Sequence, residues 1–465
     1  MSETKRFSSG LLVLMLVLLF ASAIPFPALS QAGGVPPVIQ RHDRDGDGRV
    51  SRDEFRGPPQ AFQSMDRNGD GYLTVDEFRG GKRGQRGGRQ SSGQRDQQKK
   101  GRQPRQPDEN GRQDTVSTSS PRTGPLRFVD THTHLHPVGL DKTHGGEGGG
   151  FQGRLNEGEN LAEAALKLII RMDQQRLKTA LIVVVPSGQS GPETTYSLMR
   201  DTVRRHPDRL KLLAGGALLG PMLQETDPSA VTDEIKRRFR EVAERVLDDG
   251  AVGFGEMISY HLCMNPKHTF QYAAPDHPLY LLLADIAAKR NVPIDLHMEA
   301  IERSVPTPNH LKRRCDKNPE TLEPTIPGLE VLLRHNPNAR IVWEHIGWDN
   351  TGQMSPSLMR RLLSEHANLF ISLRGLDRNQ TRDGRSFPNR IFDTAGRTVK
   401  PEWRQLIEDF PDRVMLGADE FIGPGDKAKL AASFEKTWSI PDIFPGEVGE
   451  MIGGENARRI FKLGN

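Results

Sequence analysis

The stretch "FVDTHTHLHP", residues 128–137, sets three histidines at every second position directly after an apolar start. In a β-strand, residues two apart point to the same face. We therefore expect Asp130, His132 and His134 to share the inner face of a strand, with the two threonines between them facing outward. His136 keeps the same spacing, but a proline follows it, so we expect this histidine in a loop.

Seven further apolar runs follow, with longer amphipathic segments between them. Their near-continuous apolar character is typical of parallel strands that are covered on both faces. The runs, with the first one included, are "RFVDTH" (127–132), "TALIVVVPSG" (179–188), "LKLLAGGAL" (210–218), "AVGFGEM" (251–257), "VPIDLHME" (292–299), "RIVWEHIGW" (340–348), "NLFISLRG" (368–375) and "RVMLGADE" (413–420).

The segments between these runs have helical spacing, as in Ile235, Phe239, Val242, Ala243 and Val246. Strands that alternate with helices predict an α/β fold, here a single (β/α)8 TIM barrel over residues 127–465. An open doubly wound sheet would normally carry a glycine-rich phosphate turn after its first strand, and "THTHLHPVG" is not one.

Side chains of metal-ligand type end four of the later runs. Glu256 ends the fourth run, His297 the fifth, His345 the sixth and Asp419 the eighth. The carboxyl ends of barrel strands meet at one rim, where barrel enzymes place their active sites. Because a buried histidine or carboxylate is costly unless it is paired or coordinated, this distribution predicts a metal site.

Over residues 127–465 the pattern resembles the amidohydrolase superfamily of metal-dependent TIM-barrel hydrolases. The segment "IGGENARRIF" (452–461) also resembles the Gly-Gly-x-Asn-Ala closing helix of the amidohydrolase-related branch. The resemblance implies one metal ion on His132, His134 and Asp419, and a second on His297 and His345. Glu256 would bridge the two ions, which is similar to the TatD-like pattern. Imidazole and carboxylate ligands suit Zn²⁺ first, with Mn²⁺ or Fe²⁺ as alternatives and one or two ions bound.

The candidate catalytic residues are Asp419 and His345. A bound ion would lower the pKa of its water toward ~7, and Asp419 could pass the water's proton to the leaving group. Arg374, after the seventh run, and Trp348, beyond His345, are the candidate substrate-binding residues.

We expect a hydrolase that acts on an ester, lactone or amide-type bond of a small molecule. One alternative is a nonoxidative decarboxylase of the amidohydrolase-related branch, because Arg374 would suit the carboxylate of its substrate. A second alternative is a TatD-like nuclease, which Glu256 would suit. A third is an inactive barrel attached to an envelope surface. The substrate and the oligomeric state are left open by the sequence.

The N-terminal segment predicts export. Lys5 and Arg6 precede the apolar run 11–24, and a small-residue pattern precedes Ser30, which is typical of a secretory signal peptide over residues 1–30. The run is shorter than the ~20 residues of a membrane-spanning helix, so we expect no transmembrane span after cleavage. We predict a periplasmic or secreted protein. Such a compartment would permit its two cysteines, Cys263 and Cys315, to pair, although the sequence does not decide this.

Residues 36–80 contain two copies of one pattern, "DRDGDGRVSRDEF" (43–55) and "DRNGDGYLTVDEF" (66–78). Both resemble EF-hand loops, which supply Ca²⁺ with six to eight oxygen ligands. Val50 and Leu73 stand at position 8, where paired loops meet in a short β bridge. We expect a small α-helical module with a structural or tethering calcium role. The expected ligand positions are Asp43, Asp45, Asp47, Arg49, Ser51 and Glu54 in the first loop, and Asp66, Asn68, Asp70, Tyr72, Thr74 and Glu77 in the second.

Residues 81–124 are predicted to form a disordered basic linker, because a segment with so few apolar residues cannot offset its ordering entropy. Residues 79–124 hold twelve Lys and Arg against four Asp and Glu, which is a net charge of +8. The net charge of +4 of the whole chain therefore comes from this tract. The tract could bind polyanions weakly. A solvated spacer is the favoured interpretation, because no aromatic residues are interspersed for base stacking.

Overall fold

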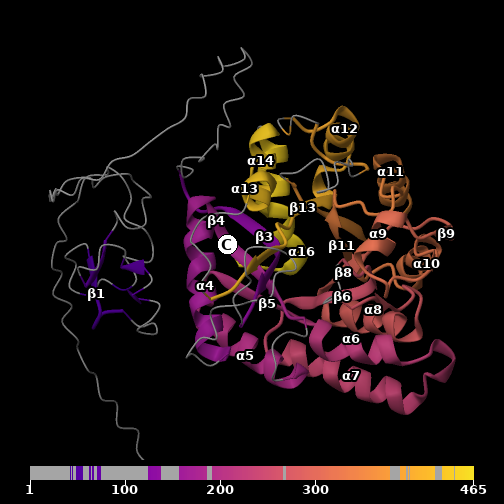
Figure 1. Cartoon of the computed structure of the whole chain (residues 1–465), viewed down its shortest axis with the longest axis horizontal. Coiled ribbons are helices and arrows are strands. Elements are labelled where there is room, and N and C mark those ends of the chain that lie inside the picture. The colour runs from indigo at the N-terminus through magenta and orange to yellow at the C-terminus, as the bar shows by residue number, and fades with distance from the viewer. Residues whose placement is uncertain are drawn as a thin grey trace, which may run out of the picture. The chain divides into compact units, whose positions relative to one another are not determined.

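The computed structural model describes residues 42, 44, 49–55, 62–63, 65–66, 71–74, 124–137, 157–185, 191–264, 269–376, 388–393, 396, 398–424, 432–444 and 446–464. A curved sheet of parallel strands forms the centre of the C-terminal part, with helices around it (Figure 1). The strands are β3 (Phe128–Leu135), β4 (Leu177–Val183), β5 (Leu210–Gly215), β6 (Gly253–His261), β8 (Pro293–Met298), β11 (Arg340–Ile346), β12 (Leu369–Leu373), β13 (Val414–Leu416) and β14 (Glu420–Ile422). Each of the eight predicted runs contains a strand.

The eighth run closes the sheet in two pieces. Its first half, β13, pairs with β12, and its second half, β14, pairs with β3. The strand order β13-β12-β11-β8-β6-β5-β4-β3-β14 therefore returns to the same segment of chain. Asp419 lies between the two halves. The predicted TIM-type α/β fold is confirmed.

Helices connect the strands and cover the outside of the sheet (Figure 1). They are α4 (Glu157–Gln174), α5 (Pro192–Arg204), α6 (Gly216–Glu225), α7 (Asp233–Asp248), α8 (Pro278–Arg290), α10 (Ile326–His335), α11 (Pro356–Glu365) and α12 (Pro401–Asp409). Thr232 caps the start of α7 by accepting a hydrogen bond from the Ile235 amide. The face predicted for this helix is the buried one, with Phe239, Ala243 and Val246 fully inaccessible to solvent.

The amino-terminal end of the barrel is closed by the chain's own C-terminus. After α13 (Ala432–Trp438), α14 (Ile440–Ile443) and α15 (Glu447–Glu450), a π-helical turn (Met451–Glu455) leads into α16 (Asn456–Phe461). Ile460 and Phe461 of α16 pack against Val129, Val183 and other inward residues of the strands.

The packing around the "GGENA" segment (453–457) explains why it contains two glycines and an asparagine. A side chain on Gly453 would meet the Phe128 ring at 2.6 Å, and one on Gly454 would meet the Arg127 carbonyl at 2.7 Å. Asn456 donates to the carbonyls of Pro411 and Val414, at 2.7 and 2.8 Å. The two glycines therefore allow close approach to the start of β3, and the asparagine holds the start of β13.

Small elements extend from the carboxyl rim. They are β7 (Gln271–Tyr272), β9 (Val305–Pro306), α9 (Asn309–Arg314) and β10 (Thr321–Leu322). A disulfide joins Cys263, beyond β6, to Cys315, at the end of α9. The Asn318 side chain accepts from the Cys263 amide at 2.8 Å and donates to the Cys263 carbonyl at 2.9 Å. The pairing that the sequence left open is present.

The EF-hand module contains a pair of short strands. The strands β1 (Arg49–Ser51) and β2 (Tyr72–Thr74) are antiparallel, and Val50 lies opposite Leu73, as predicted. In the second loop, Asp66 accepts from the Gly71 amide at 2.9 Å, and Gly71 has a φ of 84°. The predicted calcium ligands that lie outside the described residues are Asp43, Asp45, Asp47, Asn68, Asp70 and Glu77.

The predicted signal peptide (residues 1–30) and residues 81–123 of the predicted linker also lie outside the described residues. Within the described part of the chain, no helix combines the length and the apolar character that a membrane crossing requires.

Candidate metal centre

Six side chains from five strands or strand ends meet at the carboxyl rim. His132 and His134 come from β3, Glu256 from β6, His297 from β8, His345 from β11, and Asp419 from the break between β13 and β14. All are buried except His297, which is partly exposed. The structure brings together every residue that the sequence predicted as a ligand of the catalytic metal.

Three ligand atoms converge on the β3 side of the centre. His132 Nε2 lies 3.2 Å from His134 Nε2, and Asp419 Oδ1 lies 3.1 Å from His134 Nε2 and 4.0 Å from His132 Nε2. Ligands at 2.0–2.2 Å from a tetrahedral Zn²⁺ are about 3.3–3.6 Å apart. Asp419 Oδ1 is also buried without a hydrogen-bond partner among the described residues. The spacing and this orphaned oxygen both fit a divalent ion.

Glu256 divides its two carboxylate oxygens between two pairs of histidines. Its Oε2 lies 3.7 Å from Nε2 of both His132 and His134. Its Oε1 lies 2.5 Å from His297 Nδ1 and 3.3 Å from His345 Nε2. Each oxygen of Glu256 could therefore help one pair of histidines to hold an ion, and the residues present would suit either one ion or two.

Glycines shape the backbone around Glu256. A side chain on Gly216 would come within 2.3 Å of the Glu256 carbonyl and 2.8 Å of the Val184 carbonyl. The preceding Gly215 has a φ of 123°, which favours glycine. The "AGG" at the end of the third run therefore lets β5 lie directly against the ligand-bearing end of β6.

Two of the ligand residues have strained backbones. His345 has a φ of 63° and Asp419 a φ of 48°, which is the left-handed region that non-glycine residues seldom occupy. Such residues cluster at functional sites, where the surrounding structure maintains them.

Burial and neighbouring charges set the ionisation of the centre. Burial lowers the pKa of His345 to about 3, so its imidazole is neutral, as a metal ligand requires. Burial raises the pKa of Glu256 and of Asp419, but stronger attractions reverse this. His297 and His132 hold the Glu256 pKa well below its usual range, and the Arg374 guanidinium does the same for Asp419. Both carboxylates are anionic at neutral pH.

Asp130 does not share the direction of the two histidines, and that expectation was wrong. Its carboxylate accepts from the indole of Trp438 on α13 at 3.2 Å and from the His132 amide at 3.0 Å. Thr131, which we expected to face outward, instead contacts the Ser372 hydroxyl at 2.9 Å. The register of β3 against β4 shifts between Asp130 and Thr133, and such a bulge interrupts the alternation of faces.

The two candidate substrate-binding residues lie side by side next to Asp419. Arg374 forms an ion pair with Asp419 Oδ2, and its guanidinium stacks on the Trp348 ring at 4.4 Å. Arg374 is 7% exposed. Substrate binding by Arg374 and Trp348 remains a prediction, and the contact that Arg374 makes in the structure is with the candidate catalytic carboxylate.

Sequence reasoning missed two acids that lie beneath the ligands, Asp295 and Glu344. Asp295 Oδ2 lies 2.9 Å from His132 Nδ1, and Glu344 Oε2 lies 3.9 Å from the same atom. Both are acids inside apolar strands, Asp295 two residues before His297 and Glu344 directly before His345, which is a signal that could have found them. Phe421 was missed as well, and it stacks on the His134 ring at 4.3 Å.

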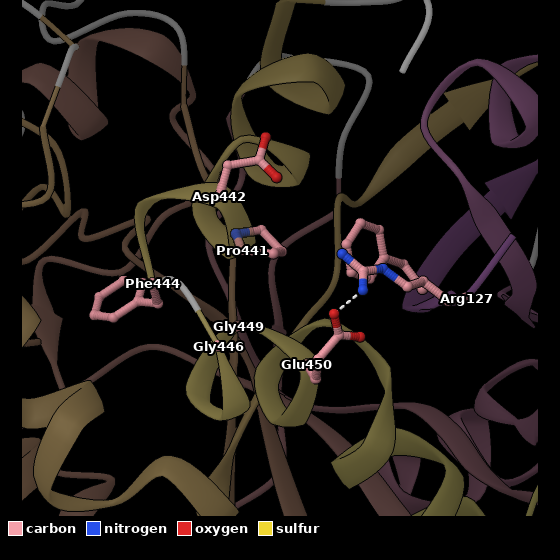
Figure 2. Close-up of a pocket in the computed structure, with 8 residues that line it drawn as sticks. Arg127, Pro441, Asp442, Phe444, Gly446, Gly449 and Glu450 are labelled. Atoms are coloured by element: carbon pink, nitrogen blue, oxygen red, sulfur yellow. Dashed lines mark hydrogen bonds and ion pairs between the residues drawn. The ribbon is translucent and has the colours of Figure 1, made fainter. Parts of the chain in front are cut away.

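A separate hollow of about 230 Å³ lies at the opposite end of β3 (Figure 2). It is lined by Arg127, Phe128 and residues of α14 and α15, and Arg127 is ion-paired with Glu450 across it. The hollow lies at the start of β3, whereas the histidines point into the barrel from its later part, so the hollow has no part in the metal centre.

Two models of known protein families match this chain. The amidohydrolase family model matches residues 129–463, and the EF-hand model matches residues 38–57 and 60–80. No curated protein matches the chain.

Several solved structures are similar to this chain. One is a dihydroxybenzoic acid decarboxylase from Polaromonas sp. JS666 with bound manganese and an inhibitor, 2-nitroresorcinol (12% identity, 72% of this chain and 97% of that one, TM-score 0.37). Another is a 4-oxalomesaconate hydratase from Rhodopseudomonas palustris (13% identity, 72% and 95%, TM-score 0.41). A third is a beta-aspartyl dipeptidase from Fervidobacterium islandicum AW-1 (14% identity, 73% and 73%, TM-score 0.37).

Proposed function

Because the chain belongs to the amidohydrolase family, we propose that it is an exported hydrolase that cleaves an ester, lactone or amide-type bond of a small molecule with activated water. Membership makes it a metal-dependent enzyme of the amidohydrolase superfamily. The reaction type, the metal and the location are our proposals.

The arrangement of Asp419 is the observation that carries hydrolysis. Its Oδ2 is held by Arg374, while its Oδ1 faces the ring nitrogens of His132 and His134. An anionic carboxylate fixed beside the position of a nucleophilic water can take the proton of that water and deliver it to the leaving group. Asp419 is thus the proposed general base.

The remaining ligands complete a centre for one or two divalent ions, with Zn²⁺ proposed first. A bound ion would lower the pKa of its water and polarise the scissile carbonyl. His345, neutral and 9% exposed, closes the β11 side of the centre. Glu256 keeps the two histidine pairs at a fixed separation through its two oxygens.

Arg374 favours hydrolysis over decarboxylation. A decarboxylase needs a cation for the carboxylate of its substrate, and Arg374 was our candidate for that role. In the structure this guanidinium is already paired with Asp419 and covered by Trp348. Hydrolysis uses this ion pair as it stands, whereas substrate binding by Arg374 would have to break it.

Two further parts of the proposal concern the rest of the chain. Export is supported by the leader pattern of residues 1–30 and by the Cys263–Cys315 disulfide, since disulfides persist mainly in oxidising compartments. Calcium binding is supported by the loop pattern and by the paired strands β1 and β2. Extracellular modules need only weak calcium affinity, which suits a structural role.

The test measures metal content and turnover on the same purified protein. Bound transition metals are quantified, and the enzyme is then assayed on ester, lactone and amide panels, on aromatic acids with detection of CO₂, and on DNA. We expect bound metal and hydrolysis, both abolished in the double variant His132→Ala, His134→Ala. His335→Ala, a histidine on the surface of α10, is the matched control and should retain both.

The other possible results of these assays would support one of the alternative functions or refute the proposal. CO₂ release without hydrolysis would replace our proposal by the decarboxylase, and cleavage of DNA by the nuclease. A folded wild-type protein with neither bound metal nor turnover would refute the metal-dependent mechanism.

A further inference from the structure

We propose that Asp295 is a positioning residue that fixes which ring nitrogen of His132 faces the metal centre. The inference rests on the proposed metal-dependent function, but it concerns a residue outside the ligand set. Its test reads metal affinity and imidazole protonation, so it does not depend on knowing the substrate.

Asp295 is placed for this role by the strand that also carries a ligand. It lies on β8 two residues before His297, and both side chains reach the interior of the barrel. Its Oδ2 is 2.9 Å from His132 Nδ1, and both side chains are fully inaccessible to solvent. Because bulk solvent does not reach the pair, this contact decides the orientation of the ring.

The contact selects one form of the imidazole. A neutral imidazole has one donor nitrogen and one acceptor nitrogen. When Nδ1 carries the hydrogen and donates to Asp295, the lone pair is left on Nε2. That atom points toward the other ligands, 3.2 Å from His134 Nε2 and 3.7 Å from Glu256 Oε2. A carboxylate acceptor also raises the basicity of the ligand nitrogen.

The barrel makes room for this pair with two glycines. A side chain on Gly255 would lie 3.0 Å from Asp295 Cβ and 3.2 Å from Asp295 Oδ1. A side chain on Gly417 would lie 2.9 Å from His132 Cβ. Substituents at either position would push the carboxylate or the ring aside. Gly255 of "GFGEM" and Gly417 of "MLGAD" are explained by this close approach.

The neighbouring acid does not share the role. Glu344 Oε2 is 3.9 Å from His132 Nδ1, which is beyond hydrogen-bond distance, whereas Asp295 is well within it. Asp295 is therefore the acceptor for His132 Nδ1, and Glu344 is too far from this atom to take that role.

The experiment compares the Zn²⁺ affinity of the apo-protein and its variants by competition with a chromophoric chelator. Asp295→Asn preserves the size of the side chain but removes its charge, and we expect a 10–100-fold loss of affinity, the usual effect of losing an outer partner of a ligand. The absorption spectrum of the Co²⁺ form should change as well. Asp349→Asn is the control, a buried aspartate that accepts from the Thr351 and Gly352 amides instead of a ligand, and it should stay within twofold.

A double-mutant cycle separates positioning from a general loss of structure. If Asp295 acts through His132, then Asp295→Asn should have no further effect on affinity in a His132→Ala background. An equal loss in both backgrounds would overturn the proposal, and so would an unchanged affinity of the single variant.

A measurement on the wild type covers the case in which Asp295→Asn fails to fold. Nitrogen-15 spectra of the metal-bound protein should show His132 with hydrogen on Nδ1, and hydrogen on Nε2 would overturn the proposal. A wild-type protein that binds no metal would instead refute the proposed function.

Discussion

Removing the disulfide should destabilise the barrel by about 4 kcal/mol. The perturbation is the double variant Cys263→Ala, Cys315→Ala. The bond closes a loop with a sequence separation of 52, and in the loop-entropy relation a crosslink of that span stabilises the folded state by about 4 kcal/mol. The Asn318 bonds to the Cys263 backbone do not involve sulfur, so they remain in the variant and do not add to the loss.

Equilibrium unfolding in guanidinium chloride, at equal metal occupancy, measures this difference between the oxidised wild type and the variant. For a barrel of 339 residues the same free energy corresponds to a melting temperature roughly 6 °C lower. The wild type reduced under denaturing conditions and refolded with its thiols blocked should match the variant. A loss below ~1 kcal/mol, or two free thiols in the unreduced wild type, would refute the reasoning, because the crosslink would then contribute nothing or be absent.

Three further predictions follow from single contacts. Arg374→Met keeps an unbranched apolar side chain but leaves Asp419 without its cation, so kcat at saturating metal should fall about 10–100-fold, the value of one charged hydrogen bond; an unchanged kcat would contradict the pairing. Phe239→Ala empties a fully buried position on α7 and should cost about 3–5 kcal/mol in urea unfolding, and a cost under ~1 kcal/mol would disprove its core role. Glu54→Ala should weaken calcium binding in calorimetric titration while its exposed neighbour variant Asp53→Ala does not, and equal affinities would exclude Glu54 as a ligand.

The fold could be predicted from the sequence because the strands of this barrel are covered on both faces. Most of the strands are near-continuous apolar runs, and the predicted ligands of the later runs stand at or near their carboxyl ends. The division of the last run into β13 and β14 was not predicted. It depends on the backbone turn at Asp419, and no periodicity reports a single residue with positive φ.

The candidate ligands could be predicted from their position at strand ends. The side of the strand to which each residue points could not always be predicted. Strict alternation placed Asp130 with the histidines, but the bulge in β3 reversed that assignment. Asp295 was overlooked for a related reason. It stands mid-strand and not at a strand end, and its partner His132 lies 163 residues away in the chain.

The two candidate ligands with positive φ show how the backbone fixes the position of the metal centre. His345 and Asp419 each occupy a left-handed conformation that costs of order 1–3 kcal/mol for a non-glycine residue. Both are held by neighbouring backbone groups, since the Trp348 amide donates to the His345 carbonyl at 2.8 Å and the Asp419 amide donates to the His132 carbonyl at 2.9 Å. The second bond joins the two ends of the closed sheet, because it links the break in the last strand to β3. The position of the proposed general base is therefore set by barrel closure itself, and a catalytic carboxylate at this point requires all eight predicted strands to be in place.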